Sequence, residues 1–146
     1  MSGGGKPRPT GVMTQRPVPY PDDASEGFWT ACARHELVIQ TCAACGHRRF
    51  PPRPMCPRCR SLESTWEPAS GRGHVWSWVV AHPPVLPSFA DRVPFNVAVI
   101  ELEEGVRMIG NIFDVENSDI RDGMPVEVTF EDVEDGVSLP QWRPAR

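Results

Sequence analysis

Apolar and polar residues alternate in several stretches of the second half of the chain. Over residues 126–131 every second position is apolar, which is the pattern of a strand with one buried face. Further β-type runs predict strands over about 74–82, 95–102, 106–113 and 137–142. The hairpin signal Glu103-Glu104-Gly105 separates two of these runs. The second half is therefore expected to contain five strands.

Five strands of this kind are typical of one closed architecture. The first strand follows the glycines of segment 71–73, and a connecting segment at 118–123 precedes the fourth strand. A small antiparallel sheet removes its exposed edges by closing on itself, and the OB-type barrel is the five-stranded form with this kind of connection. The sequence therefore predicts a five-stranded OB-fold barrel over residues 66–146.

The first predicted strand of this barrel carries two tryptophans. A period of two places one set of side chains on one face and the other set opposite: His74, Trp76, Trp78 and Val80 against Val75, Ser77, Val79 and Ala81. Aromatic side chains exposed on an OB barrel can stack on nucleic-acid bases, whereas buried ones fill the core or a subunit interface. The acidic surroundings favour the second interpretation.

The amino-terminal part of the chain has a different pattern. Residues 1–21 are rich in glycine and proline, which predicts a flexible leader. Apolar residues then recur at helical spacing, and the residues before them are typical helix caps, so a helix is expected over about 24–35. Because Phe28 and Trp29 are adjacent, they cannot point the same way. One is expected to pack on the ribbon, and the other to be offered outward.

Four cysteines follow a short apolar run at 37–40, in two pairs of identical spacing. They are Cys42, Cys45, Cys56 and Cys59. Two Cys-x-x-Cys turns can place four thiolates around one tetrahedral ion, the usual ligand set of a structural zinc site. The sequence therefore predicts a rubredoxin-like zinc ribbon over residues 22–65, together with the helix. Iron also fits such ligands, and unligated thiols or two disulfides are the alternative. Four protein ligands leave no open position for catalysis.

The fifth cysteine, Cys32, is expected to be a small packing residue in the helix. An unpaired cysteine beside a metal motif is typical of a reducing compartment. No apolar run approaches the ~20 residues that a spanning helix needs, and the amino terminus lacks a hydrophobic signal core. The expected location is the cytoplasm, without membrane contact.

Charge is unevenly distributed, although the formal net charge is only −4. Twelve acidic residues lie between residues 101 and 135. Five arginines and no acid lie between residues 47 and 60; they are Arg48, Arg49, Arg53, Arg58 and Arg60. This cluster is a candidate clamp for the phosphates of a nucleotide-bearing ligand, a candidate footprint for nucleic acid, or simple compensation of a negative tetrathiolate centre.

The order of these features resembles a known family. The matching stretches are Phe28-Trp29, Leu37-Val38-Ile39-Gln40, Cys42-Ala-Ala-Cys45-Gly46, Pro51-Pro52-Arg53, Cys56-Pro57-Arg58-Cys59, Trp66-Glu67 and Ser70-Gly71-Arg72-Gly73. From about residue 22 to the end, the chain resembles the acyl-CoA-associated zinc-ribbon and OB-fold proteins catalogued as domain of unknown function thirty-five. One departure is Arg60, where the family has glycine at a position that favours a left-handed backbone.

The resemblance implies a mainly β protein that is a non-catalytic accessory subunit. Members dock on thiolase-superfamily enzymes, including lipid-transfer-protein-like aldolases of steroid side-chain breakdown, or on hot-dog hydratases, and help to hold or pass a CoA thioester. For this chain we therefore expect structural zinc, an acyl-CoA bound together with the partner, and docking through the helix at Phe28-Trp29 and parts of the OB domain. Arg48, Arg49 and Arg53 of the arginine cluster are the candidates for CoA-phosphate contacts. A single-stranded nucleic-acid binding module is the alternative.

Overall fold

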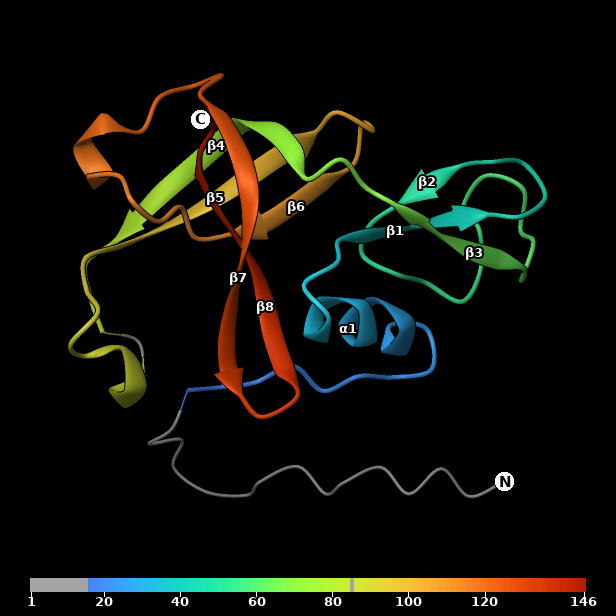
Figure 1. Ribbon diagram of the computed structural model, residues 1–146, viewed down its shortest axis with the longest axis horizontal. Helices are drawn as coiled ribbons and strands as arrows, with labels where there is room; N and C mark the ends of the chain where they lie inside the picture. Colours follow the sequence, from blue (N-terminus) through green and yellow to red (C-terminus); the bar gives the residue numbers. More distant parts are fainter. Residues whose placement is uncertain (1–15, 85) are drawn as a thin grey trace.

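The computed structural model describes residues 16–84 and 86–146, which form one small ribbon and one barrel (Figure 1). The elements are α1 (Glu26–Ala33), β1 (Val38–Cys42), β2 (Arg48–Arg49), β3 (Ser64–Pro68), β4 (Arg72–Ala81), η1 (Pro87–Phe89), β5 (Phe95–Leu102), β6 (Arg107–Gly110), η2 (Asn117–Asp119), β7 (Pro125–Glu134) and β8 (Val137–Pro144). This order confirms a mainly β protein with an amino-terminal helix. Most of the predicted leader, residues 1–15, lies outside the described residues.

Helix α1 is shorter at both ends than the expected 24–35. Before it, the backbone N–H of Ser25 donates to Asp22 Oδ1 (2.8 Å) and the backbone N–H of Asp22 donates to Ser25 Oγ (3.0 Å). This reciprocal pair holds a turn, so the helix begins only at Glu26. At the other end His35 adopts a left-handed backbone with φ 59°, which stops the helix.

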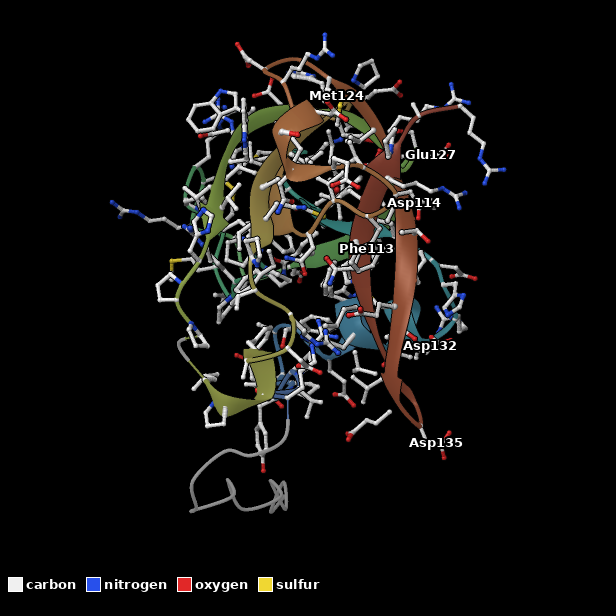
Figure 2. All side chains as sticks on the ribbon, turned by 90° about the vertical axis from the view of Figure 1, so that its left-hand side faces the viewer. Phe113, Asp114, Met124, Glu127, Asp132 and Asp135 are labelled. Carbon is white, nitrogen blue, oxygen red and sulfur yellow. The ribbon has the colours of Figure 1, made fainter. Side chains whose placement is uncertain are left out.

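The helix lies between the ribbon and the hairpin formed by β7 and β8 (Figure 1). After the helix ends, His35 Nε2 lies 2.7 Å from Asp132 Oδ1 on β7, and the His35 ring stacks on Phe130 with centroids 5.1 Å apart. Figure 2 shows Asp132 close to the level of the helix and Asp135 at the tip of the hairpin. These contacts fix α1 against the barrel.

The ribbon is a three-stranded antiparallel sheet with the order β2-β1-β3. The central strand, β1, places Gln40 opposite Arg49 on one side and opposite Trp66 on the other. Strand β3 crosses the predicted division between residues 65 and 66, because Trp66 and the two residues after it still pair with β1. The division into 22–65 and 66–146 stays a prediction.

The second sheet has the order β6-β5-β4-β7-β8 and closes into the expected OB-fold barrel. Closure comes from a parallel bridge between Ile112 and Trp142 that follows β6. The N–H of Phe113 donates to the Trp142 carbonyl (2.7 Å), and the N–H of Trp142 donates to the Asn111 carbonyl (2.9 Å). The five predicted strands are all present, although β6 is shorter than 106–113 and β7 and β8 extend further.

The predicted faces of β4 are wrong beyond its fourth residue. The register between β4 and β5 shifts between Val75 and Ser77, which is a β-bulge. Because a bulge adds one residue to the strand, the alternation reverses after it. Trp76 follows the buried Val75 and is exposed, and the reversal turns Trp78 inward, where it packs against the core. The two tryptophans do not share a face, and a strict period of two could not reveal this.

One continuous core joins the barrel to the helix and the ribbon. Its largest fully buried side chains are Trp142, Ile39, Ile100, Met108, Val75 and Val126. Ile39 comes from the ribbon and Phe28 from the helix, and both belong to the same cluster as the barrel residues. Cys32 is also fully buried in this cluster, which confirms its expected packing role. The orientation of the ribbon is therefore set by apolar packing.

Candidate metal centre

The cysteines lie on two turns of the same construction. In the first turn, which follows β1, the N–H of Gly46 donates to the Cys42 carbonyl (3.0 Å). In the second, the N–H of Arg60 donates to the Cys56 carbonyl (2.9 Å). Both donors have a left-handed backbone, with φ 75° at Gly46 and 66° at Arg60. Arg60 thus adopts the conformation that glycine favours, and its departure from the family pattern leaves the turn geometry intact.

The two turns bring four sulfur atoms together. All four Sγ atoms lie within 4.8 Å of one another. The Cys42 and Cys59 sulfurs are 3.5 Å apart, and the Cys45 and Cys56 sulfurs are 3.7 Å apart. Zn–S bonds of about 2.3 Å in a tetrahedron place the sulfurs roughly 3.8 Å apart, so the arrangement fits one such ion. All four cysteines are free thiols, without disulfides.

Backbone amides prepare two of the thiols for ionisation. The N–H of Cys45, and then that of Ala44, lowers the pKa of Cys42 to about 6 against the opposing effect of burial. The N–H of Cys59, and then that of Arg58, lowers the pKa of Cys56 in the same way. Metal ions bind thiolates rather than thiols. In each turn, the backbone N–H groups therefore favour the thiolate form of the first, buried cysteine, which is the form that binds a metal ion.

The thiol of Cys59 shows why the cluster needs a cation. The N–H of Ser61 favours the Cys59 thiolate, but the neighbouring cysteine sulfurs and burial outweigh it and raise the pKa of Cys59 to about 11. Four adjacent thiolates repel one another, and a divalent ion removes that repulsion. When bound, such an ion supplies a structural cross-link, because four sulfurs leave it no open position.

A buried glutamine holds the loop between the two turns. Gln40 Nε2 donates to the Arg53 carbonyl (3.0 Å) and to Ser64 Oγ (3.2 Å), and the N–H of Arg53 donates to Gln40 Oε1 (2.7 Å). The side chain thus ties strand β1 to the loop that carries Cys56. This role of Gln40 was not predicted from the sequence. The signal was a glutamine placed among apolar residues in the run 37–40.

The three arginines expected at a CoA phosphate do not converge on one point. Arg48 is exposed and makes a two-pronged ion pair with Glu67, with Nε to Oε2 at 3.1 Å and Nη2 to Oε1 at 2.9 Å. Arg49 is only 5% exposed, and its Nη2 donates to the Arg53 carbonyl (3.1 Å). Arg53 holds the loop through its backbone hydrogen bonds to Gln40, and the residue itself is exposed. The structure brings together no phosphate clamp from these three residues.

A shallow hollow of about 530 Å³ lies between the ribbon and the β5–β6 hairpin. It is lined by Thr41, Gly46, His47, Arg48, Arg58, Glu67, Glu104, Gly105 and Val106. The Arg48 guanidinium, and then the Thr41 hydroxyl, holds the pKa of Glu67 below its usual range, so the carboxylate balances the arginine. The hollow contains both signs of charge, and contact of these arginines with a CoA phosphate stays a prediction.

The two helix aromatics have different environments. Phe28 is 2% exposed, with its ring centroid 5.4 Å from that of Phe50 in the ribbon and 5.0 Å from that of Trp29. Phe28 therefore packs internally, which corrects its expected role as a partner contact. Trp29 is partly buried and lines a hollow of about 620 Å³ with the segment 19–23 and the tip of the β7–β8 hairpin. Docking through the helix stays a prediction for Trp29 alone.

The exposed tryptophan of the barrel is also already engaged. The Arg107 guanidinium lies over the Trp76 ring at 4.0 Å from its centroid. Because Trp78 packs on the core, Trp76 and Trp78 do not form a common exposed surface on which bases could stack. Within residues 16–84 and 86–146, no helix is both long and apolar enough to cross a membrane.

The ribbon with four clustered cysteines and the closed barrel define a zinc-ribbon and OB-fold protein. Comparison with known families agrees on both parts. The rubredoxin-like zinc ribbon domain of ChsH2 matches residues 29–64, and the C-terminal OB-fold domain of ChsH2 matches residues 66–131. The chain belongs to this ChsH2 (DUF35) family, as the resemblance had predicted.

Individual relatives extend the comparison. A DUF35 domain-containing scaffold protein of Methanocaldococcus jannaschii is 41% identical over 71% of this chain and 77% of its own length. The 3-oxo-4,17-pregnadiene-20-carboxyl-CoA hydratase alpha subunit of Mycobacterium tuberculosis is 42% identical over 80% of this chain. The chain spans about two fifths of the length of the hydratase alpha subunits it matches.

A solved structure shows the same fold. A chain of the Ltp2-ChsH2(DUF35) aldolase superposes with a TM-score of 0.81 and is 38% identical. The match covers 88% of this chain and 99% of that chain. The similarity therefore includes both the ribbon and the barrel, in the same relative arrangement.

Proposed function

We propose that this chain is a non-catalytic accessory subunit that docks on a thiolase-superfamily enzyme acting on acyl-CoA. The observation that carries the proposal is the match, along nearly the whole length of that chain, to a chain of the Ltp2-ChsH2(DUF35) aldolase. The scaffold name of the Methanocaldococcus jannaschii relative supports the same role. The catalytic groups are those of the partner enzyme.

The metal part of the proposal is a structural zinc ion held by Cys42, Cys45, Cys56 and Cys59. The sulfur separations of 3.5 and 3.7 Å support it, because they match a tetrahedral site. The zinc fixes the two turns and hence the surface around them, and takes no part in a reaction. Metal analysis of the purified protein distinguishes zinc from iron, which the same four ligands accept.

The substrate class follows from the relatives. One relative is named for a steroid carboxyl-CoA, and another protein of the family forms an aldolase with Ltp2. We infer that the enzyme served by this chain acts on a steroid-derived CoA thioester, as an aldolase of the lipid-transfer-protein type. A hot-dog hydratase is the second partner class, favoured by the hydratase alpha subunit names. The CoA is bound mainly by the partner, since Arg48 and Arg49 are engaged within this chain.

The test is co-expression with the thiolase-superfamily enzyme encoded beside this chain. The expected result is a stable complex on size-exclusion chromatography, with activity that depends on both chains and no turnover by this chain alone. Mixing the separately purified chains serves as the control for assembly during synthesis. A partner that is equally soluble and equally active without this chain would contradict the proposal.

A further inference from the structure

Three neighbouring strands of the barrel carry an apolar outer face. In the antiparallel register Val99 of β5 lies opposite Ile109 of β6, and Val97 of β5 lies opposite Val79 of β4. Residues directly opposite one another point to the same side of a sheet. We call the residues Trp76, Val79, Val97, Val99 and Ile109 the sheet face. Figure 1 shows β4, β5 and β6 side by side, away from the tip of the β7–β8 hairpin.

Three residues of the sheet face are exposed and its β5 residues, Val97 and Val99, are half-buried, although all five are of the kind that barrels bury. Ile109 is 67% exposed, Val79 is 63% exposed and Trp76 is 48% exposed. The β-bulge after Val75 produces this arrangement: Trp76 already points outward because it follows the buried Val75, and the bulge turns Val79 to the same side. Without the bulge, β4 would present a different set of side chains. Grouped apolar residues on the outside of a folded domain mark an interaction surface.

The rim of the sheet face carries balanced charge. The Arg107 guanidinium covers the Trp76 ring and its Nε lies 3.0 Å from Glu101 Oε2. His74 Nε2 lies 3.7 Å from the other oxygen of the same carboxylate. The face therefore has no excess of positive charge. Its tryptophan and arginine are the residue types that contribute most to protein interfaces, and its centre lacks charge, as interface centres do.

We propose that the sheet face is the surface through which this chain docks on its enzyme subunit, an inference that rests on the proposed function. Charge argues against the other occupants. Nucleic acid needs cationic side chains, and the one arginine here is already paired with Glu101. A second copy of this chain would bring together two molecules with a formal charge of −4 each. The partner that fits is a different protein, the enzyme subunit, which would cover the sheet face with an uncharged apolar patch of its own.

The test uses the full chain and the thiolase-superfamily subunit encoded beside it, with affinity measured by calorimetry. The double variant Val79→Lys, Ile109→Lys introduces two charges into the sheet face at sites that are already exposed. Burying those ammonium groups is unfavourable, so binding is expected to weaken by at least roughly 30-fold. Trp76→Ala is expected to weaken it by about 10-fold. The matched control is Leu62→Lys, since Leu62 is 70% exposed in the ribbon loop, and it should bind within about 2-fold of wild type.

Unchanged zinc content and melting temperature of the double variant show that only the surface has changed. If wild-type chain binds the enzyme and the double variant binds equally well, the docking surface is elsewhere and this inference is overturned while the proposed function stands. If wild-type chain does not bind the enzyme, both are overturned. A homodimer of the wild-type chain that the double variant abolishes would assign the sheet face to a second copy and overturn the enzyme as its occupant.

Discussion

The ribbon and the barrel fold by different means, although they share a core. The ribbon has short strands, of 5, 2 and 5 residues, and its buried apolar residues come mainly from the run 37–39. The barrel has strands of up to 10 residues and buries Val75, Ile100, Met108 and Trp142 among others. A region with so little apolar burial needs a cross-link, whereas a closed barrel supplies its own stability. The difference predicts which changes each region tolerates.

Loss of one metal ligand should have the largest effect and should affect the ribbon. In Cys45→Ser the zinc is expected to leave, and with it a binding free energy on the order of 10 kcal/mol that holds the two turns. Hydrogen exchange should then show fast amides in β1 and β2 and persistent protection in β4 and β5. Zinc content per chain is measured in parallel.

Cys32→Ala is the matched control for this variant, because Cys32 is buried but lies outside the sulfur cluster. It should keep its zinc and lose only the packing of a small side chain, about 1 kcal/mol. If β4 and β5 exchange as fast as β1 in Cys45→Ser, the two regions form one cooperative unit and the comparison between them fails.

The second prediction concerns the barrel core. Trp142 is fully buried where β8 bridges to Ile112, so Trp142→Ala removes the side chain that fills the closure of the barrel. The expected loss in the free energy of unfolding is about 3–5 kcal/mol, measured by urea denaturation. Zinc content should be unchanged. Trp76→Ala removes the same side chain from an exposed site and is expected to cost less than about 1 kcal/mol.

The third prediction compares two buried glutamines. Gln40 holds the loop before Cys56, and Gln141 Oε1 accepts from the N–H of Asn111 (2.6 Å) in the barrel. Gln40→Met and Gln141→Met keep the volume but leave backbone groups without partners, at about 1–3 kcal/mol each. Because Gln40 orients a ligand loop, only Gln40→Met should also weaken zinc binding, by roughly 10- to 100-fold. Competition with a zinc chelator measures this, and equal zinc affinities would refute the assigned role of Gln40.

Much of this organisation could be predicted from the sequence because the signals were local. The spacing of the four cysteines depends on two short turns, and the five strands follow from short-range alternation. The failures were non-local. The bulge after Val75 arises from the pairing of β4 with β5, so a strand read alone placed Trp76 and Trp78 together. The ion pair of Arg48 with Glu67 joins residues of two different strands, which the predicted phosphate clamp had ignored.

The smallest effects are expected at two non-glycine residues with a left-handed backbone, one in each region. Arg60 in the ribbon has φ 66° and Asp114 in the barrel has φ 57°. Such a backbone costs an L residue about 1 kcal/mol, and aspartate tolerates it better than arginine because its short side chain bonds locally. Arg60→Gly should therefore stabilise by about 0.5–1 kcal/mol, and Asp114→Gly by less. Zinc release during thermal unfolding distinguishes the two variants. Only Arg60→Gly should retain zinc to a higher temperature, since only Arg60 belongs to a cysteine turn. Equal gains, both without effect on zinc retention, would show that the strain at Arg60 is not coupled to the metal centre.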